Sequence, residues 1–221
     1  MMICITRAVC SLRAVISLVL ISAVVTFSSV SLAATNNLVI ADHEIEPVIP
    51  ASSQHPELKL NGASLRLYYG FVETYIGKLY VENPTTDEKA LTEADEYKRM
   101  VFKVVMKRIS GRRMAKAMYD ALQSNLSQEE ALSLESRLVM MVDMFDSKLN
   151  RGEEGYIEWV PGVGSRIVIN DEVKGIIPGK DLNDAIINIW IGENPIGSTF
   201  KKHILGLEKY GESKTNSRRG R

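Results

Sequence analysis

One arginine stands among hydroxyl-bearing side chains in a stretch that can form a ligand pocket. Arg66 lies in LRLYYGFVETYIGKLYVEN, residues 65–83, together with Tyr68, Tyr69, Thr74, Tyr75 and Tyr80. Because successive side chains of a strand point to opposite faces, Arg66 and Tyr68 share one face and Leu65 and Leu67 the other. If the leucine face packs on the core, Arg66 is an ordinary exposed arginine. If Arg66 instead faces a pocket, its guanidinium can hold a carboxylate or enolate oxygen.

Other kinds of site chemistry lack suitable residues. His43 and His55 lie in a polar N-terminal segment, and His203 stands beside lysines, so we expect no metal site. No serine occupies a nucleophile elbow, and no glycine-rich loop has the spacing that binds phosphates or a dinucleotide. The acidic pairs Glu129-Glu130 and Glu153-Glu154 are typical of solvated charge at a helix start and a turn. We therefore predict no catalytic residues, no metal and no cofactor.

Residues 1–33 have the features of an export signal. Arg7 and Arg13 give a basic start, residues 14–25 are almost wholly apolar, and Ser31-Leu32-Ala33 offers small residues at both positions that a signal peptidase reads. We expect cleavage after Ala33 and export, with the periplasm as the destination. The alternative is an uncleaved membrane anchor, since the apolar run is nearly long enough to span a bilayer.

Removal of this leader changes what the chain can do. Both cysteines, Cys4 and Cys10, lie within it, so the mature chain has no disulfide, thiol or cysteine metal site. The 27 basic residues minus the two arginines of the leader leave 25 against 27 acidic residues, a formal charge of −2. Such a balance gives no electrostatic case for nucleic acid or anionic membranes, and we expect no stable membrane insertion.

The remaining chain divides into three parts. Residues 34–57 are polar and proline-containing, which predicts a linker or flexible arm, and residues 208–221 predict a disordered basic tail. Residues 58–207 predict one domain. Its first strands are expected at 58–60 and 65–69, around an Asn61-Gly62 turn, and then at 71–81 and 98–109.

Helical periodicity begins after this strand-rich region. One helix is expected from Ser110, with the apolar stripe that includes Met114 and Met118 in the core, and a second from Ser127, with Glu130 forming a capping box. A meander of three strands should follow at 156–160, 166–169 and 173–177. A helix capped by Asp181 and a short helix that Ser198 caps and that runs through Leu205 complete the domain. Antiparallel strands with inserted helices predict an α+β fold with helices on one sheet face.

Five segments carry a family resemblance over residues 58–206. In order they are LNGASLR, YIGKLYVEN, PGVGSRIVIND, GIIPGKDLNDAIINIWIGENP and KKHILG. They resemble the bacterial exported branch of the chalcone isomerase-like family. The resemblance implies an open-faced β-sandwich, in which a large antiparallel sheet carries helices on one face and a ligand cleft lies between them. It also implies either isomerisation of a chalcone, as in the plant enzymes, or binding of a carboxylate by the arginine, as in the fatty-acid-binding relatives.

The family's functional residues match this chain only in part. The family arginine falls on Arg66 and the threonine on Thr74, three residues before Gly77. The tyrosine and asparagine of the plant helix fall on Met114 and Ala121. A thioether and a methyl group cannot order water or hydrogen-bond a substrate, and Tyr119 lies at the wrong helical angle to replace the tyrosine. The isomerase activity is therefore not carried over.

We therefore expect an exported, non-catalytic protein that binds a small amphipathic acid, such as a fatty acid, or an aromatic ligand, through Arg66 and Thr74. Two alternatives stay open. The first is an intramolecular lyase of the chalcone type with an altered site, and the second is a protein-interaction domain of the cell envelope. No nucleic-acid partner is expected, and the sequence names no protein partner.

Overall fold

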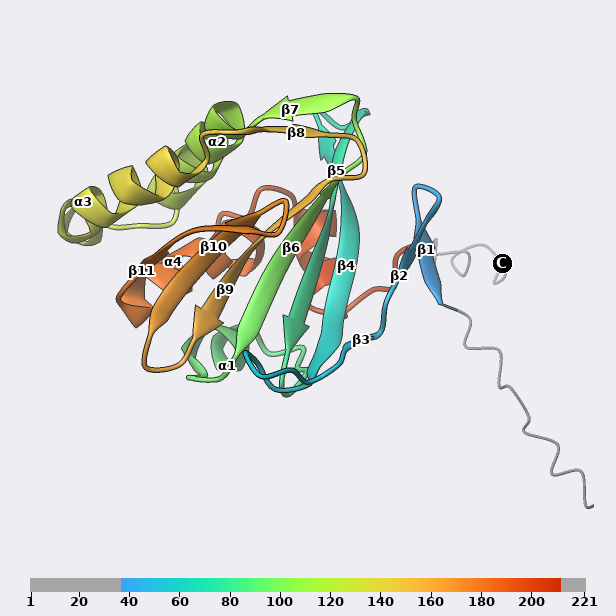
Figure 1. Ribbon diagram of the computed structural model, residues 1–221, viewed down its shortest axis with the longest axis horizontal. Helices are drawn as coiled ribbons and strands as arrows, with labels where there is room; N and C mark the ends of the chain where they lie inside the picture. Colours follow the sequence, from blue (N-terminus) through green and yellow to red (C-terminus); the bar gives the residue numbers. More distant parts are fainter. Residues whose placement is uncertain (1–36, 212–221) are drawn as a thin grey trace, which may run out of the picture. The chain divides into compact units, whose positions relative to one another are not determined.

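A seven-stranded antiparallel sheet forms the centre of the computed structural model, which describes residues 37–211 (Figure 1). The strand order is β11-β10-β9-β6-β5-β4-β3. These strands are β3 (Val48–Ile49), β4 (Leu58–Tyr68), β5 (Val72–Val81), β6 (Lys98–Val104), β9 (Glu154–Val160), β10 (Gly164–Ile169) and β11 (Glu172–Ile177). Two separate two-stranded sheets pair β1 (Leu38–Ile40) with β2 (His43–Ile45), and β7 (Arg108–Ser110) with β8 (Lys148–Asn150).

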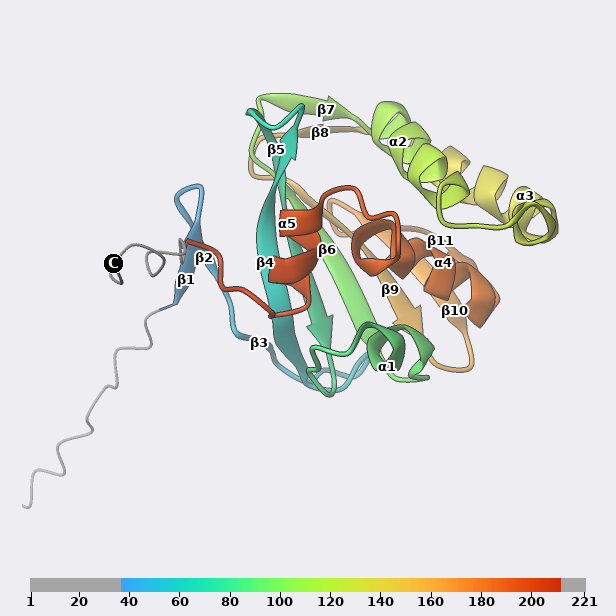
Figure 2. The same cartoon turned by 180° about the vertical axis from the view of Figure 1, so that it is seen from behind.

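Helices cover one face of this sheet. They are α1 (Glu88–Glu93), α2 (Gly111–Gln123), α3 (Gln128–Met144), α4 (Lys180–Ile191) and α5 (Ser198–Ile204). Figure 2 shows α4 and α5 in front of the strands, and α4 also contacts α1, α2 and α3. The predicted α+β class, a large antiparallel sheet with helices on one face, is confirmed. No helix among residues 37–211 combines the length and the apolar character needed to cross a bilayer.

The main core lies between the sheet and the helices. Phe102 and Ile167 from the sheet, Leu122 and Leu138 from α2 and α3, and Trp190 from α4 are each at most 2% exposed. The α3 start has the predicted capping box, because the Ser127 amide donates to Glu130 Oε2 (2.8 Å) and the Glu130 amide donates to Ser127 Oγ (3.3 Å). The three-strand meander β9-β10-β11 is also confirmed.

The prediction of a turn at Asn61-Gly62 is wrong. Strand β4 runs through both residues, and its pairing with β5 is irregular between Leu60 and Gly62. Helix α5 packs directly on this point: a Cβ at Gly62 would stand 2.0 Å from the carbonyl oxygen of His203. Asn61 Nδ2 donates to the carbonyl of Ile204 (2.9 Å). The two residues therefore admit a helix against the strand instead of reversing the chain.

Several predicted boundaries also differ. The strand expected over 98–109 ends at Val104, and Arg108 begins the separate strand β7. The residue that caps α4 is Gly179, while Asp181 lies in the first helical turn and pairs with Arg137. Likewise, Gly197 precedes α5, so Ser198 is its first residue instead of its cap.

The segment expected to be a linker contains β1, β2 and β3 over its described part. Ile40 and Ile45 are at most 1% exposed, and they pack with Ile76 on the sheet face opposite the helices. Of the expected tail, residues 208–211 are described, and the Tyr210 ring lies 5.4 Å from the His203 ring. The export signal at 1–33 and the remainder of the tail lie outside the described residues.

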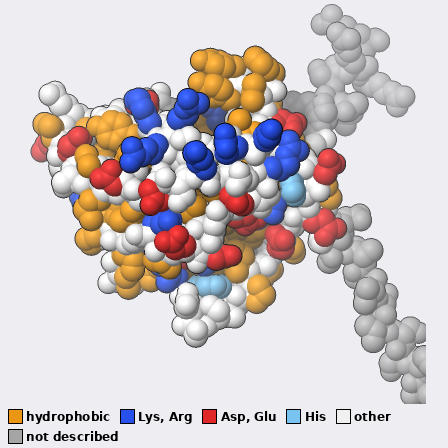
Figure 3. All heavy atoms as spheres, turned by 45° about the horizontal axis from the view of Figure 1, so that its top comes forward, with side chains coloured by type: hydrophobic (Ala, Val, Ile, Leu, Met, Phe, Trp, Pro, Cys, Tyr) orange, Lys and Arg blue, Asp and Glu red, His pale blue; other side chains and the backbone are white. Residues whose placement is uncertain are grey.

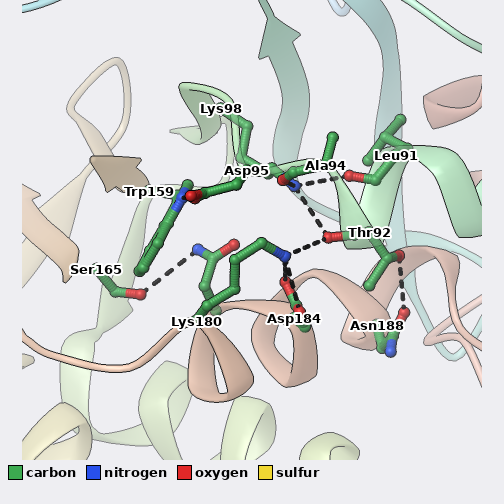
Figure 4. A network of polar contacts seen from close by, with 11 residues as sticks. Leu91, Thr92, Ala94, Asp95, Lys98, Trp159, Ser165, Lys180, Asp184 and Asn188 are labelled. Atoms are coloured by element: carbon green, nitrogen blue, oxygen red, sulfur yellow. Dashed lines mark hydrogen bonds and ion pairs between the residues drawn. The ribbon is translucent and has the colours of Figure 1, made fainter. Parts of the chain in front are cut away.

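A buried lysine fixes the end of α1 (Figure 4). Lys98 is 1% exposed, and its Nζ donates to the carbonyls of Leu91 (2.7 Å), Thr92 (3.1 Å) and Ala94 (2.9 Å). These carbonyls lie at the C-terminal end of the helix, where a cation is favourable. Burial nevertheless lowers the pKa of Lys98 to about 8, with the charge of Lys180 acting in the same direction.

Candidate ligand-binding cleft

A cleft of about 420 Å³ opens between the β4–β5 hairpin, β7, and helices α2 and α4. Its principal polar lining residues are Arg66, Tyr68, Thr74, Tyr75, Arg108 and Arg113. Its principal apolar lining residues are Val72, Met114, Ala117, Met118, Ile189 and Ile196. The cleft thus combines cationic and hydroxyl groups with an apolar wall contributed mainly by α2 and α4.

Arg66 faces this cleft because the β1–β2 hairpin covers the opposite face of β4, where Leu65 points. Leu65, its neighbour, packs with Ala63 and Ile76 against the β1–β2 hairpin on the face opposite the helices. Since side chains alternate along the strand, Arg66 points to the helix side. Of the two orientations that the sequence left open, the structure therefore has the arginine in a cleft.

The second predicted residue, Thr74, lies in the same cleft at an irregularity of the sheet. Arg66 pairs with Tyr75 and Leu67 pairs with Glu73, so Thr74 is the extra residue of a β-bulge. Consequently Thr74 and Tyr75, although adjacent in sequence, both line the cleft. Thr74 Oγ1 donates to the carbonyl of Arg66 (2.8 Å), which leaves the hydroxyl lone pairs to accept from a ligand.

The guanidinium of Arg66 forms no ion pair with a carboxylate of residues 37–211. Its Nη1 donates to the backbone carbonyl of Leu67 (2.5 Å), and the side chain is half-buried. A guanidinium has five N–H donors in a planar fork, and this single bond uses one of them. Arg66 can therefore offer paired donors to an anion in the cleft.

Tyr75 adds a phenol to the site through a long-range contact. Trp190 Nε1 donates to Tyr75 Oη (3.2 Å), so the phenol accepts this bond and keeps its own proton available. Burial raises the pKa of Tyr75 above its ordinary value, although the Trp190 hydrogen bond and the charge of Arg66 act in the opposite direction. The phenol is therefore a neutral donor at physiological pH.

The other hydroxyl-bearing residues near Arg66 have different positions. Tyr68 lines the cleft, whereas Tyr69 is 77% exposed at the hairpin turn. Tyr80 is buried, and its hydroxyl donates to the carbonyl of Glu46. Only part of the cluster seen in the sequence therefore contributes to the site.

Met114 of helix α2 lines the cleft. The Tyr119 hydroxyl, by contrast, donates to Glu135 on α3. Ala121, at the position of the family asparagine, packs against the main core instead. The prediction that Tyr119 cannot replace the family tyrosine agrees with this geometry. Helix α2 therefore contributes the thioether of Met114 to the cleft, at the position where the resemblance places the tyrosine of the plant enzymes.

Sequence reasoning missed three contributors: Arg108, Arg113 and Trp190. The arginines fall in KRISGRR, at the boundary where a strand was expected to pass into a helix. The excess of basic residues in that segment is the one local signal that could have indicated an anion-binding contribution. Trp190 is 115 positions from Tyr75, so its contact has no local signature. Among the described residues, no group of three or more His, Cys, Asp and Glu side chains is arranged to hold a metal.

The fold has known counterparts. A model of the chalcone isomerase-like family matches residues 39–206, and the chain belongs to this family. A solved structure similar to this chain is a fatty-acid binding protein from Arabidopsis thaliana, with 16% sequence identity and a TM-score of 0.62. The match covers 77% of this chain and 96% of the plant chain, and at this identity it establishes the fold alone. A comparison with curated protein sequences finds no match.

Proposed function

We propose that the protein binds a small amphipathic acid, such as a fatty acid, without transforming it. The observation that carries this proposal is the guanidinium of Arg66, which lies in the cleft without a carboxylate partner among residues 37–211. In this proposal Arg66 holds the ligand carboxylate, and Thr74 and Tyr75 complete its hydrogen bonds.

The shape and lining of the cleft suit such a ligand. Its volume of about 420 Å³ lies in the range of small-molecule sites, which are mostly apolar with a few directed polar groups. An acyl chain that leaves Arg66 would meet Met114, Met118 and Ile189. Burial of that chain and pairing of its carboxylate with Arg66 would stabilise the complex together.

The comparisons support binding more than catalysis. The plant protein that shares this fold is a fatty-acid binding protein. The resemblance places the tyrosine and asparagine used by the plant isomerases at Met114 and Ala121, which supply neither a phenol nor an amide. An open cleft whose Arg66 has no carboxylate partner among residues 37–211 also favours a ligand-binding protein over a domain that acts only by contacting another protein.

The place of action is proposed from the N-terminal sequence. The basic start, apolar run and small-residue site of residues 1–33 favour export to the periplasm with cleavage after Ala33. A binding protein in that compartment would meet acids released from, or passing between, the membranes of the cell envelope.

Native mass spectrometry of the protein purified gently from its own cell envelope tests the proposed function. We expect an acidic lipid to accompany the wild-type chain and to be absent from Arg66→Ala. Arg112→Ala is the matched control, because Arg112 is exposed at the start of α2 and does not line the cleft. Titration with a saturated fatty acid should show at least about tenfold weaker binding in Arg66→Ala, as expected for loss of a charged hydrogen bond. A wild-type protein that carries no lipid and binds no fatty acid would overturn the proposal.

A further inference from the structure

The β4–β5 hairpin ends in exposed aromatic side chains. Tyr68 is 51% exposed, Tyr69 is 77% exposed and Phe71 is 77% exposed. We call these three residues the aromatic tip. Large apolar side chains in such a contiguous exposed group indicate an interaction site more often than isolated ones do.

Tyr69, at the aromatic tip, has a backbone conformation that is unfavourable for a bulky side chain. Tyr69 and Gly70 are the central residues of the turn, with φ of 51° and 80°. Hairpin turns of this kind favour asparagine, aspartate or glycine, and a bulky residue at positive φ is strained. Burial does not compensate the strain, because Tyr69 is mostly exposed. Strain held at an exposed aromatic residue points to a function of that residue.

Six cations lie beside the tip. They are the exposed residues Lys107, Arg108, Arg112, Arg113, Lys148 and Arg151, which we call the basic face. The β7–β8 pairing gathers them, since Ser110 is opposite Lys148 and the Arg151 amide donates to the Lys107 carbonyl (3.2 Å). None of the six forms an ion pair with a carboxylate of residues 37–211. By contrast, Lys103 nearby is paired with Glu154 (2.9 Å).

Figure 3, which brings forward the end of the molecule that carries β7 and β8, shows lysine and arginine side chains in a row with a group of hydrophobic side chains beside them. The same surface borders the cleft, because Tyr68 of the tip and Arg108 and Arg113 of the basic face all belong to its lining. The near-neutral total charge predicted no attraction to anionic surfaces. The fold changes that expectation, because it collects on one face six cations that have no carboxylate partner within the described part of the chain.

We propose that this surface docks on an anionic phospholipid bilayer, with the aromatic tip entering the headgroup layer and the basic face over the lipid phosphates. Stable attachment to a membrane surface needs two signals, and an apolar insertion together with a basic patch supplies both. A bilayer fits better than nucleic acid, because an apolar tip at the edge of an apolar cleft matches a medium with an apolar interior. Docking would place the cleft mouth at the membrane, where an amphipathic acid resides.

Vesicle co-sedimentation tests this surface without any added ligand, so its outcome is independent of fatty-acid binding. The protein purified from its cell envelope is mixed with phosphatidylcholine vesicles or with equal parts of phosphatidylcholine and phosphatidylglycerol. We expect binding to the anionic vesicles alone, weakened by salt. The variants Tyr69→Ser with Phe71→Ser, and Arg112→Gln with Lys148→Gln and Arg151→Gln, should each bind at least tenfold more weakly. None of these residues lines the cleft, so fatty-acid binding should persist.

The matched control removes three exposed lysines elsewhere, by Lys59→Gln, Lys89→Gln and Lys202→Gln, and should bind vesicles like the wild type. An equal loss in this control would overturn the proposal, because net charge and not the basic face would then govern binding. The proposal would also be overturned if the protein showed no preference for anionic vesicles. It would equally be overturned if the protein bound a DNA duplex more tightly than the vesicles and the variant Tyr69→Ser with Phe71→Ser bound that duplex like the wild type.

As a second measurement, Phe71→Trp should show a blue-shifted tryptophan emission on anionic vesicles. An unshifted emission on vesicles that bind the protein would exclude insertion of the aromatic tip.

Discussion

Thr74 Oγ1 donates a 2.8 Å hydrogen bond to the backbone carbonyl of Arg66, across the point where the pairing of β4 with β5 shifts by one residue. The bond ties the bulge to the strand that carries the arginine. The carbonyl of Thr74 in turn accepts from the amides of Val105 and Met106 (3.0 and 3.2 Å). Arg66, which lines the cleft, is thereby held on a supported segment of backbone.

Removal of this hydroxyl should weaken ligand binding. Thr74→Val keeps the shape but loses both the bond to Arg66 and the proposed contact with the carboxylate, so we expect about five- to tenfold weaker fatty-acid binding, the size of one neutral hydrogen bond. Thr74→Ser retains a hydroxyl and should bind like the wild type. Isothermal titration calorimetry with one fatty acid measures both variants. Equal affinities for all three proteins would show that Thr74 has no part in binding.

Chalcone should not be converted, even at high enzyme concentration. Met114 lines the cleft at the position where the resemblance places the tyrosine of the plant isomerases. Ala121 packs against the main core, so neither side chain offers a phenol or an amide to a bound ketone. The loss of chalcone absorbance with time is the measurement. Turnover that disappears in Arg66→Ala would reinstate the isomerase alternative.

Breaking the buried charge cluster of β6, β9 and β10 should destabilise the fold. Glu158 is fully buried, and its carboxylate pairs with Arg99 (2.7 Å) and Arg166 (2.5 Å). Glu158→Gln leaves two arginines without their counter-charge, and we expect a loss of about 3 kcal/mol or more in the free energy of unfolding. Urea denaturation measures the change. The exposed pair of Lys116 with Asp120 is the control, where Lys116→Ala should cost under about 1 kcal/mol. Similar costs at both sites would contradict the role given to Glu158.

The free energy of unfolding should rise with pH through the titration of Lys98. Burial lowers its folded pKa to about 8, against 10.5 for an ordinary lysine. Between these values the unfolded chain binds a proton that the folded chain does not, so higher pH favours folding. The contribution is about 1–2 kcal/mol between pH 7 and 9.5. At higher pH, tyrosines with raised pKa values such as Tyr80 act in the opposite direction.

Denaturation of the wild type and of Lys98→Met across pH 7 to 9.5 isolates this contribution. The variant is expected to be less stable throughout, because the carbonyls at the end of α1 lose their donor, but it should lack the rise with pH. A rise of equal size in both proteins would assign the effect to other groups.

A methyl group at Gly62 should disrupt the packing of α5. The added Cβ would stand 2.0 Å from the His203 oxygen and 2.5 Å from the Ile204 oxygen, and both are backbone atoms that cannot turn aside. Gly62→Ala should therefore lower the free energy of unfolding by more than about 2 kcal/mol. Gly197→Ala is the control, since its backbone is extended and its nearest neighbour would be at 3.6 Å. A fully stable Gly62→Ala protein would argue against the close approach of the helix.

Much of the fold could be predicted because its signals are local. The capping box at Ser127 and Glu130 is a short-range pattern, as is the alternation of the β9-β10-β11 meander, and both are present where they were expected. The prediction of a turn at Asn61-Gly62 was wrong because the deciding contact is not local. A glycine that admits a turn and a glycine that admits a helix against a strand look the same in sequence, and only the position of α5 distinguishes them.

The sequence by itself determined the α+β class, the order of the main elements, and Arg66 and Thr74 as candidates for one site, because periodicity, capping and motif matching depend on neighbouring residues. The tertiary structure decided which way Arg66 faces, since the β1–β2 hairpin covers the other side of β4. It also decided that Tyr75 meets Trp190 and that scattered cations form one face beside an aromatic tip. These relationships join residues far apart in the chain, and only the packing of the sheet against its helices and hairpins brings them together.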